Sequence, residues 1–162
     1  MASKKRKMKR EFVEKKAFDV INKMAGYDNL KVCGSVRRNA KTVGDLDMVV
    51  TTQDPDLLIR SITNQAKEVL SAGKKVVRIL TYGDIQCDIY ITTEKFFDSH
   101  CLFLTGSKYF NIKTRQAAKG LGFRLSQYGL VDQRGEIVAL SEEDILNKIG
   151  YGEYLHPEMR SL

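Results

Sequence analysis

The 162-residue chain has few cysteines, few prolines and no long hydrophobic run. Its three cysteines, Cys33, Cys87 and Cys101, are an odd number without C-x-x-C spacing, which disfavours a zinc site or a disulfide framework and indicates a reducing intracellular compartment. No apolar run approaches the roughly 18–20 residues of a membrane span. The start, MASKKRKMKR, has no apolar stretch behind its charges, so it does not resemble a secretory signal. Two prolines and 43% hydrophobic residues are typical of a globular chain.

The charge of the chain is unbalanced. It has 27 Lys and Arg against 20 Asp and Glu, a formal net charge of +7. Polyanions are the natural partners of such a chain, either nucleic acid or an anionic membrane surface. Basic residues are dense in positions 1–10, and the run KKRK fits a flexible arm, a nuclear-import signal or a nucleic-acid contact equally well.

The pattern of apolar and turn residues predicts an α+β fold with two lobes. The first lobe is expected to hold a mixed sheet with helices packed on it, and the second a basic helix, short strands and a last helix. In chain order we expect a helix over 12–26, strands over 30–33 and 44–52, a helix from Asp54-Pro55 to about Ala72, and a hairpin over 74–92 centred on Gly83-Asp84. A helix over 107–122, strands over 123–131 and 136–140, and a helix over 142–150 capped by Ser141 follow.

Two aspartates stand one residue apart in the segment GDLDMVV. In a strand, Asp45 and Asp47 would project to one side while Leu46 and Met48 face the other. Parallel carboxylates repel each other unless a cation lies between them, and a hard divalent ion such as Mg²⁺ or Mn²⁺ suits oxygen ligands. The alternative is that both simply face solvent at a strand end.

A third acid lies in the second strand of the predicted hairpin. Asp88 shares a strand face with Gln86 and Tyr90 and is embedded in apolar sequence, where an unpaired charge would be costly. Asp84 competes for this place, but its position favours a turn residue. Three carboxylates from two strands could bridge two metal ions, one activating a hydroxyl and the other holding phosphates.

A Gly-Ser pair follows the strand over 30–33. Gly34 and Ser35, entering a short helix, would present backbone N–H groups to an anion, and Arg37 or Arg38 could grip a triphosphate oxygen. Gly-Ser after a strand is common, so the pair is informative only together with the three aspartates.

These motifs, in this order, resemble the nucleotidyltransferase superfamily and, more closely, the family X DNA polymerases related to polymerase beta. The resemblance covers about residues 10–162. It is carried by CGSVRRNAKTVGDLD and CDIYIT in the palm, and by FLTGSKYFNIKTR, GFRLSQYGL and EEDILNKIGYGEYLHPEMR in the thumb. It implies a basic arm over 1–10, a nucleotidyltransferase palm over 11–104, and a small α/β thumb over 105–162.

The resemblance also implies roles for individual residues. Asp45, Asp47 and Asp88 would be the catalytic metal ligands for two Mg²⁺ ions, for which Mn²⁺ can substitute, and Asp88 would receive the proton of the primer hydroxyl. The implied nucleotide-binding residues are Gly34, Ser35, Arg38, Gly44, Phe103, Gly106 and Asn111. The implied DNA contacts are Lys113, Arg115, Tyr128 and, with a looser alignment, Arg10.

The implied activity is template-directed addition of dNTPs to a DNA primer 3′-hydroxyl, with gap filling in base excision repair as its setting. Gapped or primer-template DNA and dNTPs would be the partners, without a membrane, and the protein would act as a monomer in the nucleus or at a viral replication site. Short viral members of the family have a similar pared-down architecture, so the resemblance fits a viral repair polymerase. The chain is too short for the lyase domain of the family, so removal of an abasic sugar-phosphate is not expected.

Four positions depart from the family pattern. The usual arginine two residues before the third aspartate is Gln86, and the usual acid after Thr-Gly-Ser is Lys108. The usual Tyr-Phe pair is Phe103-Leu104, so the resemblance leaves the choice between deoxyribose and ribose, and the fidelity, open. Two other functions remain open: a nucleotidyltransferase acting on a small molecule or a protein, and a non-catalytic DNA-binding module.

Overall fold

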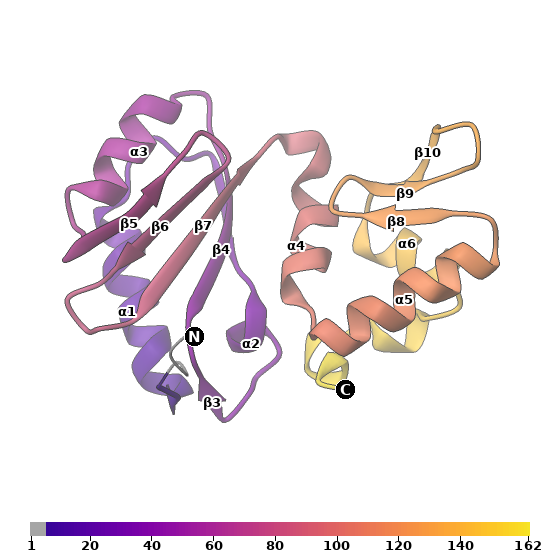
Figure 1. The fold of residues 1–162 in the computed structure, drawn as a ribbon, viewed down its shortest axis with the longest axis horizontal. Helices are drawn as coiled ribbons and strands as arrows, with labels where there is room; N and C mark the ends of the chain where they lie inside the picture. The colour runs from indigo at the N-terminus through magenta and orange to yellow at the C-terminus, as the bar shows by residue number, and fades with distance from the viewer. Residues whose placement is uncertain (1–5) are drawn as a thin grey trace.

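The computed structural model of the protein describes residues 6–162 and shows two parts joined by a helix (Figure 1). The first part is a five-stranded sheet with helices against it, and the second is a smaller group of helices and short strands. Helix α4 (Phe97–Thr105) lies between them. This arrangement confirms the predicted α+β fold.

The large sheet is mixed, as the sequence predicts. Its order is β2-β4-β7-β6-β5, and only β4 and β7 run parallel; the other neighbours are antiparallel. The strands are β2 (Asn29–Val32), β4 (Leu46–Thr51), β5 (Glu68–Ala72), β6 (Val76–Leu80) and β7 (Gln86–Thr92). The parallel pair matters most, because it places the first residues of β4 beside the first residues of β7.

One face of this sheet carries the main core. Helices α1 (Arg10–Lys23) and α3 (Pro55–Thr63) cover it (Figure 1). Alternate strand residues point into the cluster, among them Met48, Cys87 and Ile89, which are fully buried. The other residues of β4 and β7 therefore face the opposite side, where α4 covers Val49 through Cys101.

Two short elements lead to that opposite face. Helix α2 (Gly34–Arg37) follows β2, and β3 (Thr42–Val43) precedes β4. Strand β1 (Met8–Lys9) pairs with β3, so the end of the predicted basic arm is part of a two-stranded sheet. Positions 1–5 of that arm lie outside the described residues.

The second part has its own core around Phe110, Leu130 and Ile145. It contains α5 (Lys108–Gly120), β8 (Arg124–Ser126), β9 (Gly129–Val131), β10 (Ile137–Ala139) and α6 (Glu142–Lys148), followed by the 3₁₀ turns Gly152–Tyr154 and Pro157–Arg160. The predicted cap of α6 is confirmed, because the Ser141 hydroxyl accepts a hydrogen bond from the backbone N–H of Asp144.

A buried network of charges ties the two parts together. Arg37 of α2 donates to both carboxylate oxygens of Glu142 in α6, at 2.5 and 2.9 Å. Arg160 lies 3.4 Å from the same carboxylate and is completely buried. Its guanidinium also donates to the carbonyls of Tyr154 and Leu155. Because both arginines contact the same carboxylate, Glu142 fixes the position of α2 relative to α6 and to the C-terminal 3₁₀ turn that carries Arg160.

The predicted helix up to Ala72 is wrong in its second half. Helix α3 ends at Thr63, and residues 68–72 form β5, the exposed edge strand paired with β6. The chain turns between them, and the Gln65 side chain fastens this turn by donating to the carbonyl of Val20. Residues 68–72 form a strand because they hydrogen-bond to β6, and the spacing of apolar residues in the sequence does not reveal such a pairing.

Three further boundaries differ from the sequence prediction. Helix α1 starts at Arg10 and ends at Lys23, before Gly26, rather than spanning 12–26. The predicted single strand over 123–131 is the hairpin β8-β9, which turns at Gln127 and Tyr128. Helix α4 was not predicted. Among the described residues, no helix has the length and apolar character needed to cross a membrane.

Candidate active site

Three carboxylates meet at the start of the parallel strand pair. Asp47 in β4 is the register partner of Asp88 in β7, and Asp45 immediately precedes β4. Ligand oxygens of the three side chains lie within 4.8 Å of one another. Asp88 is 7% exposed, and the other two are partly exposed. Clustered carboxylate oxygens at the edge of solvent suit a hard divalent cation, so this triad could hold a metal ion. Asp84, the rival candidate, lies in the hairpin loop and pairs with Lys67, 2.7 Å away.

Gly34 closes one side of the triad. Its φ is +61°, and a Cβ atom there would lie 2.5 Å from Oδ2 of Asp47. The backbone N–H of the preceding Cys33 donates to the Asp47 carbonyl at 2.8 Å. A glycine is thus required for two reasons, the left-handed backbone and the close approach. Ser35 follows in the same helical turn, and Gly44 lies directly before Asp45.

The two arginines after Ser35 have different surroundings. Arg37 is held in the Glu142 network described above. Arg38 instead donates to the carbonyl of Thr105 at 2.5 Å and to the hydroxyl of Ser161 at 3.1 Å. Burial lowers the pKa of Arg38, and the nearby Asp47 charge partly opposes this change. Of the pair, Arg38 is the one whose pKa responds to the Asp47 charge, and Gly106 adjoins its guanidinium.

The residues implied for the sugar and base side contact one another around α4 and α5. The Asn111 amide donates to the Phe103 carbonyl at 2.8 Å, and the Arg115 guanidinium lies 5.0 Å from the centre of the Phe103 ring. This cation–π contact places an exposed basic side chain over an aromatic ring beside the sheet.

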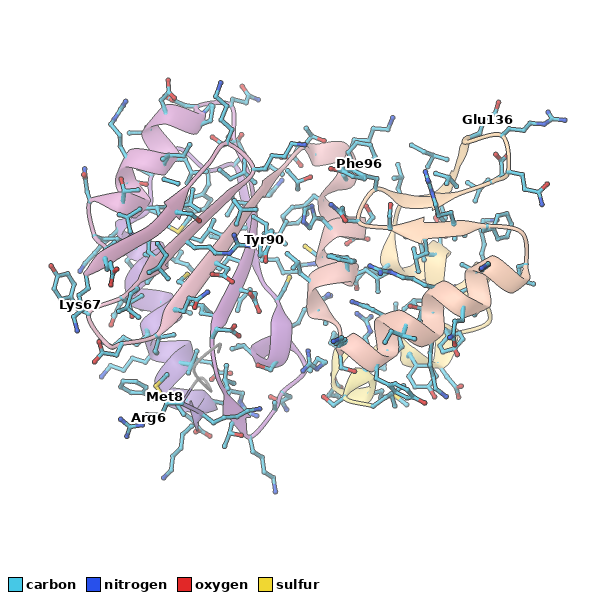
Figure 2. The ribbon with its side chains drawn as sticks, viewed as in Figure 1. Arg6, Met8, Lys67, Tyr90, Phe96 and Glu136 are labelled. Atoms are coloured by element: carbon cyan, nitrogen blue, oxygen red, sulfur yellow. The ribbon has the colours of Figure 1, made fainter. Side chains whose placement is uncertain are left out.

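A cavity of about 340 Å³ separates the end of β7 from the second part. Aromatic side chains dominate its wall, namely Tyr90, Phe96, His100, Phe103 and Tyr128. Figure 2 shows Tyr90 and Phe96 near the middle of the view, between the two parts. Tyr90 is two residues beyond Asp88 on the same strand face, so the cavity continues the surface that carries the triad.

Two of the implied DNA contacts lie apart from this group. Arg10 donates to the carbonyl of Asn39 at 2.8 Å and pairs with Glu14, so it braces the loop after α2. Lys113 is exposed on α5, with its ammonium group 5.2 Å from the Tyr109 ring. The roles of both residues toward DNA stay predictions.

The comparison with protein families agrees with this geometry. Residues 6–99 match the DNA polymerase beta palm family, and residues 100–161 match the DNA polymerase beta thumb family. The chain belongs to the DNA polymerase beta family. The residues that match the palm include the sheet and its acidic triad, and the thumb match begins within α4. The resemblance to family X polymerases is confirmed.

Two relatives show how much of such proteins the chain represents. The DNA polymerase/3′-5′ exonuclease PolX of Bacillus subtilis is 36% identical over 115 residues, which cover 68% of this chain and 20% of that protein. Repair DNA polymerase X of African swine fever virus is 27% identical over 148 residues, which cover 82% of this chain and 81% of the viral protein. The chain thus spans a fifth of the bacterial relative and about four fifths of the viral one.

Sequence reasoning missed the neighbours of Asp88 within the palm. The Gln86 amide donates to Oδ1 of Asp88 at 2.9 Å, and Nε of Arg78 in β6 lies 3.7 Å from the same oxygen. A signal was present: a hairpin centred on Gly83 pairs position 78 with position 88. The sequence predicts the hairpin, and the register of that hairpin places Arg78 opposite Asp88.

Proposed function

We propose that the protein is a template-directed DNA polymerase that adds dNTPs to a primer 3′-hydroxyl, acts as a monomer, and fills gaps during repair. The observation that carries the proposal is the acidic triad, with ligand oxygens within 4.8 Å of one another, in a chain that matches both the palm and the thumb of the family. Two Mg²⁺ ions, or Mn²⁺ in their place, are the proposed cofactors, held by Asp45, Asp47 and Asp88. Bound there, the ions would supply charge neutralisation for the phosphates.

The side chains of this protein would divide the work as follows. Asp88, the most buried of the three acids, would accept the proton of the primer hydroxyl. Gly34 and Ser35, in the first turn of α2, and Arg38 would hold the triphosphate. Phosphoryl transfer of this kind depends mainly on positioning and charge stabilisation, which the rigid β4-β7 pair can provide.

The pocket for the sugar and base would be formed at the palm–thumb junction by Phe103, Gly106 and Asn111. The hydrogen bond from the Asn111 amide to the Phe103 carbonyl supports this assignment, because it holds the Asn111 side chain against the backbone of α4. Arg115 and Tyr128 would contact the template or the new base pair, and exposed lysines such as Lys113 would neutralise phosphates. Nuclear or viral replication sites are the proposed setting.

The test is extension of a labelled primer with Mg²⁺, using each dNTP or rNTP separately on a single-nucleotide gap, an open template and a single strand. Addition of the complementary dNTP alone, fastest at the gap, is the expected result. Untemplated addition would instead indicate a terminal transferase. No addition with either Mg²⁺ or Mn²⁺, together with DNA binding that is insensitive to salt, would favour a small-molecule nucleotidyltransferase.

Asp88→Asn and Asp84→Asn form a matched pair of variants for the same assay. Both remove one carboxylate from the same hairpin, but only Asp88 belongs to the triad. Asp88→Asn should abolish extension with little change in the Kd for DNA, whereas Asp84→Asn should extend primers like the parent. Robust extension by Asp88→Asn would refute the assignment.

A further inference from the structure

Asp88 has a cationic neighbour that comes from a different strand. Strands β6 and β7 are antiparallel, and Arg78 is the register partner of Asp88. Directly opposed residues in such a pair have Cβ atoms about 4.5–5.5 Å apart, so their side chains meet. Nε of Arg78 lies 3.7 Å from Oδ1 of Asp88. The sequence position that carries an arginine in the resembling family holds the neutral Gln86 here, so this cation arrives from β6 instead.

Two polar side chains, Arg78 and Gln86, lie beside the Asp88 carboxylate. Gln86, Asp88 and Tyr90 share one face of β7, and Arg78 stands opposite the middle one. Its guanidinium lies close to the Asp88 carboxylate. The Gln86 amide donates to the same Oδ1 atom at 2.9 Å. One hydrogen-bond donor, Gln86, and one nearby cation, Arg78, at the same oxygen favour one direction for the carboxylate.

The triad needs such a constraint. Three carboxylates within 4.8 Å repel one another, and Asp88 is the member with the least access to water. Without a local cation, rotation of the Asp88 side chain away from the other two would relieve the repulsion. Groups behind a metal-binding carboxylate typically change metal affinity or activity by about 10–100-fold when they are removed.

We propose that Arg78 is a positioning residue that holds Asp88 in its place in the triad, supplying from β6 the cation that residue 86 lacks. The opposing possibility is an ordinary ion pair of a partly exposed arginine, which would have almost no effect. The kinetic part of this proposal rests on the proposed polymerase function, and the structural part does not.

The experiment uses the full chain and five variants: Arg78→Gln, Arg78→Lys, Gln86→Arg, the double variant Arg78→Gln/Gln86→Arg, and Lys74→Gln as a control that removes an exposed charge just before β6. We expect the kcat for single-nucleotide addition to fall by about 10–100-fold in Arg78→Gln and less in Arg78→Lys. The Kd for DNA should change less than about threefold, as for Lys74→Gln, since one phosphate contact at most is involved.

The double variant is the decisive one. Residue 86 is two positions from Asp88 on the same face, about 7 Å along the strand, within reach of an arginine side chain. Gln86→Arg should therefore restore most of the kcat that Arg78→Gln loses, and a merely structural role of Arg78 would not be repaired this way. An Arg78→Gln variant with the parent kcat, or a double variant as slow as Arg78→Gln, would overturn the proposal.

A crystal structure of Arg78→Gln gives a result that does not depend on activity. The Asp88 carboxylate should be turned away from Asp45 and Asp47, and it should return in the double variant. An unmoved Asp88 overturns the proposal even if the parent extends primers well. Conversely, a parent that extends no primer would refute the polymerase function while leaving this structural result intact.

Discussion

Replacing Glu142 with glutamine should destabilise the protein strongly, although α6 is far from the acidic triad in sequence. The Glu142 side chain is 8% exposed and faces two arginines, one of them, Arg160, completely buried. Burial by itself would raise the pKa of Glu142, but the hydrogen bonds and charges of Arg37 and Arg160 outweigh burial and hold that pKa below its usual value. The carboxylate is therefore ionised in the folded protein at neutral pH.

The size of the effect follows from what the substitution leaves behind. A neutral amide removes the charge that balances one buried and one partly buried guanidinium group, and losing one partner of a buried ion pair typically costs about 3–5 kcal/mol. A domain of this size has about 5–15 kcal/mol of total stability. At about 2–4 °C per kcal/mol, the Tm should fall by roughly 6–20 °C.

Urea unfolding and thermal melting of the parent, Glu142→Gln and Glu143→Gln would measure this effect. Glu143 is the control, because it is the next residue in the same helical turn and is exposed. We expect Glu143→Gln to melt with the parent. If Glu142→Gln lost less than about 1 kcal/mol, the network would be no stronger than a surface ion pair, and the reasoning would be refuted.

Three other predictions concern the glycine beside the triad, the pH dependence of stability and the cap of α3. Gly34→Ala should reduce kcat by more than about 100-fold, because the new methyl would displace Asp47 and the backbone φ of +61° disfavours alanine; single-turnover kinetics check this. Since the pKa of Glu142 is lowered by folding, its stabilisation is complete above the unfolded pKa of about 4.3 and disappears as the pH falls below it. The stability difference between the parent and Glu142→Gln should therefore shrink as the pH falls below the unfolded pKa and through the lower folded pKa, as measured by circular dichroism melts. Asp54→Ala should cost about 0.5–2 kcal/mol in urea unfolding, because its carboxylate caps α3, whereas Asp56→Ala in the first turn should cost less.

The facing directions of the three acids could be predicted from the sequence because strand alternation is a local property, whereas the pairing of β4 with β7 that brings them together is not local. The two-residue strand period sets the directions of Asp45, Asp47 and Asp88, and the apolar residues between them show which face is buried. The caps at Asp54 and Ser141 are likewise local signals, and the structure confirms both.

The features that the sequence did not yield depend on long-range pairing. Strand β5 forms because an edge of the sheet was available to residues 68–72, and their own apolar spacing fits a helix equally well. The Arg37–Glu142 contact joins positions 105 residues apart, and no local pattern marks it. Arg37 and Arg38 also have different partners, Glu142 of α6 and the Thr105 carbonyl, and these partners are distant in the sequence.

Because the parallel pairing of β4 with β7 brings Asp47 beside Asp88, the proposed polymerase activity depends on the correct register of these two strands. A slip of one residue would turn Asp88 into the apolar core, and a slip of two would carry it about 7 Å along the strand, beyond the 4.8 Å that the triad spans. Such misregistered chains could be compact and still have no centre for catalysis. The fraction of active molecules in a refolded preparation therefore measures how faithfully these two strands found their register.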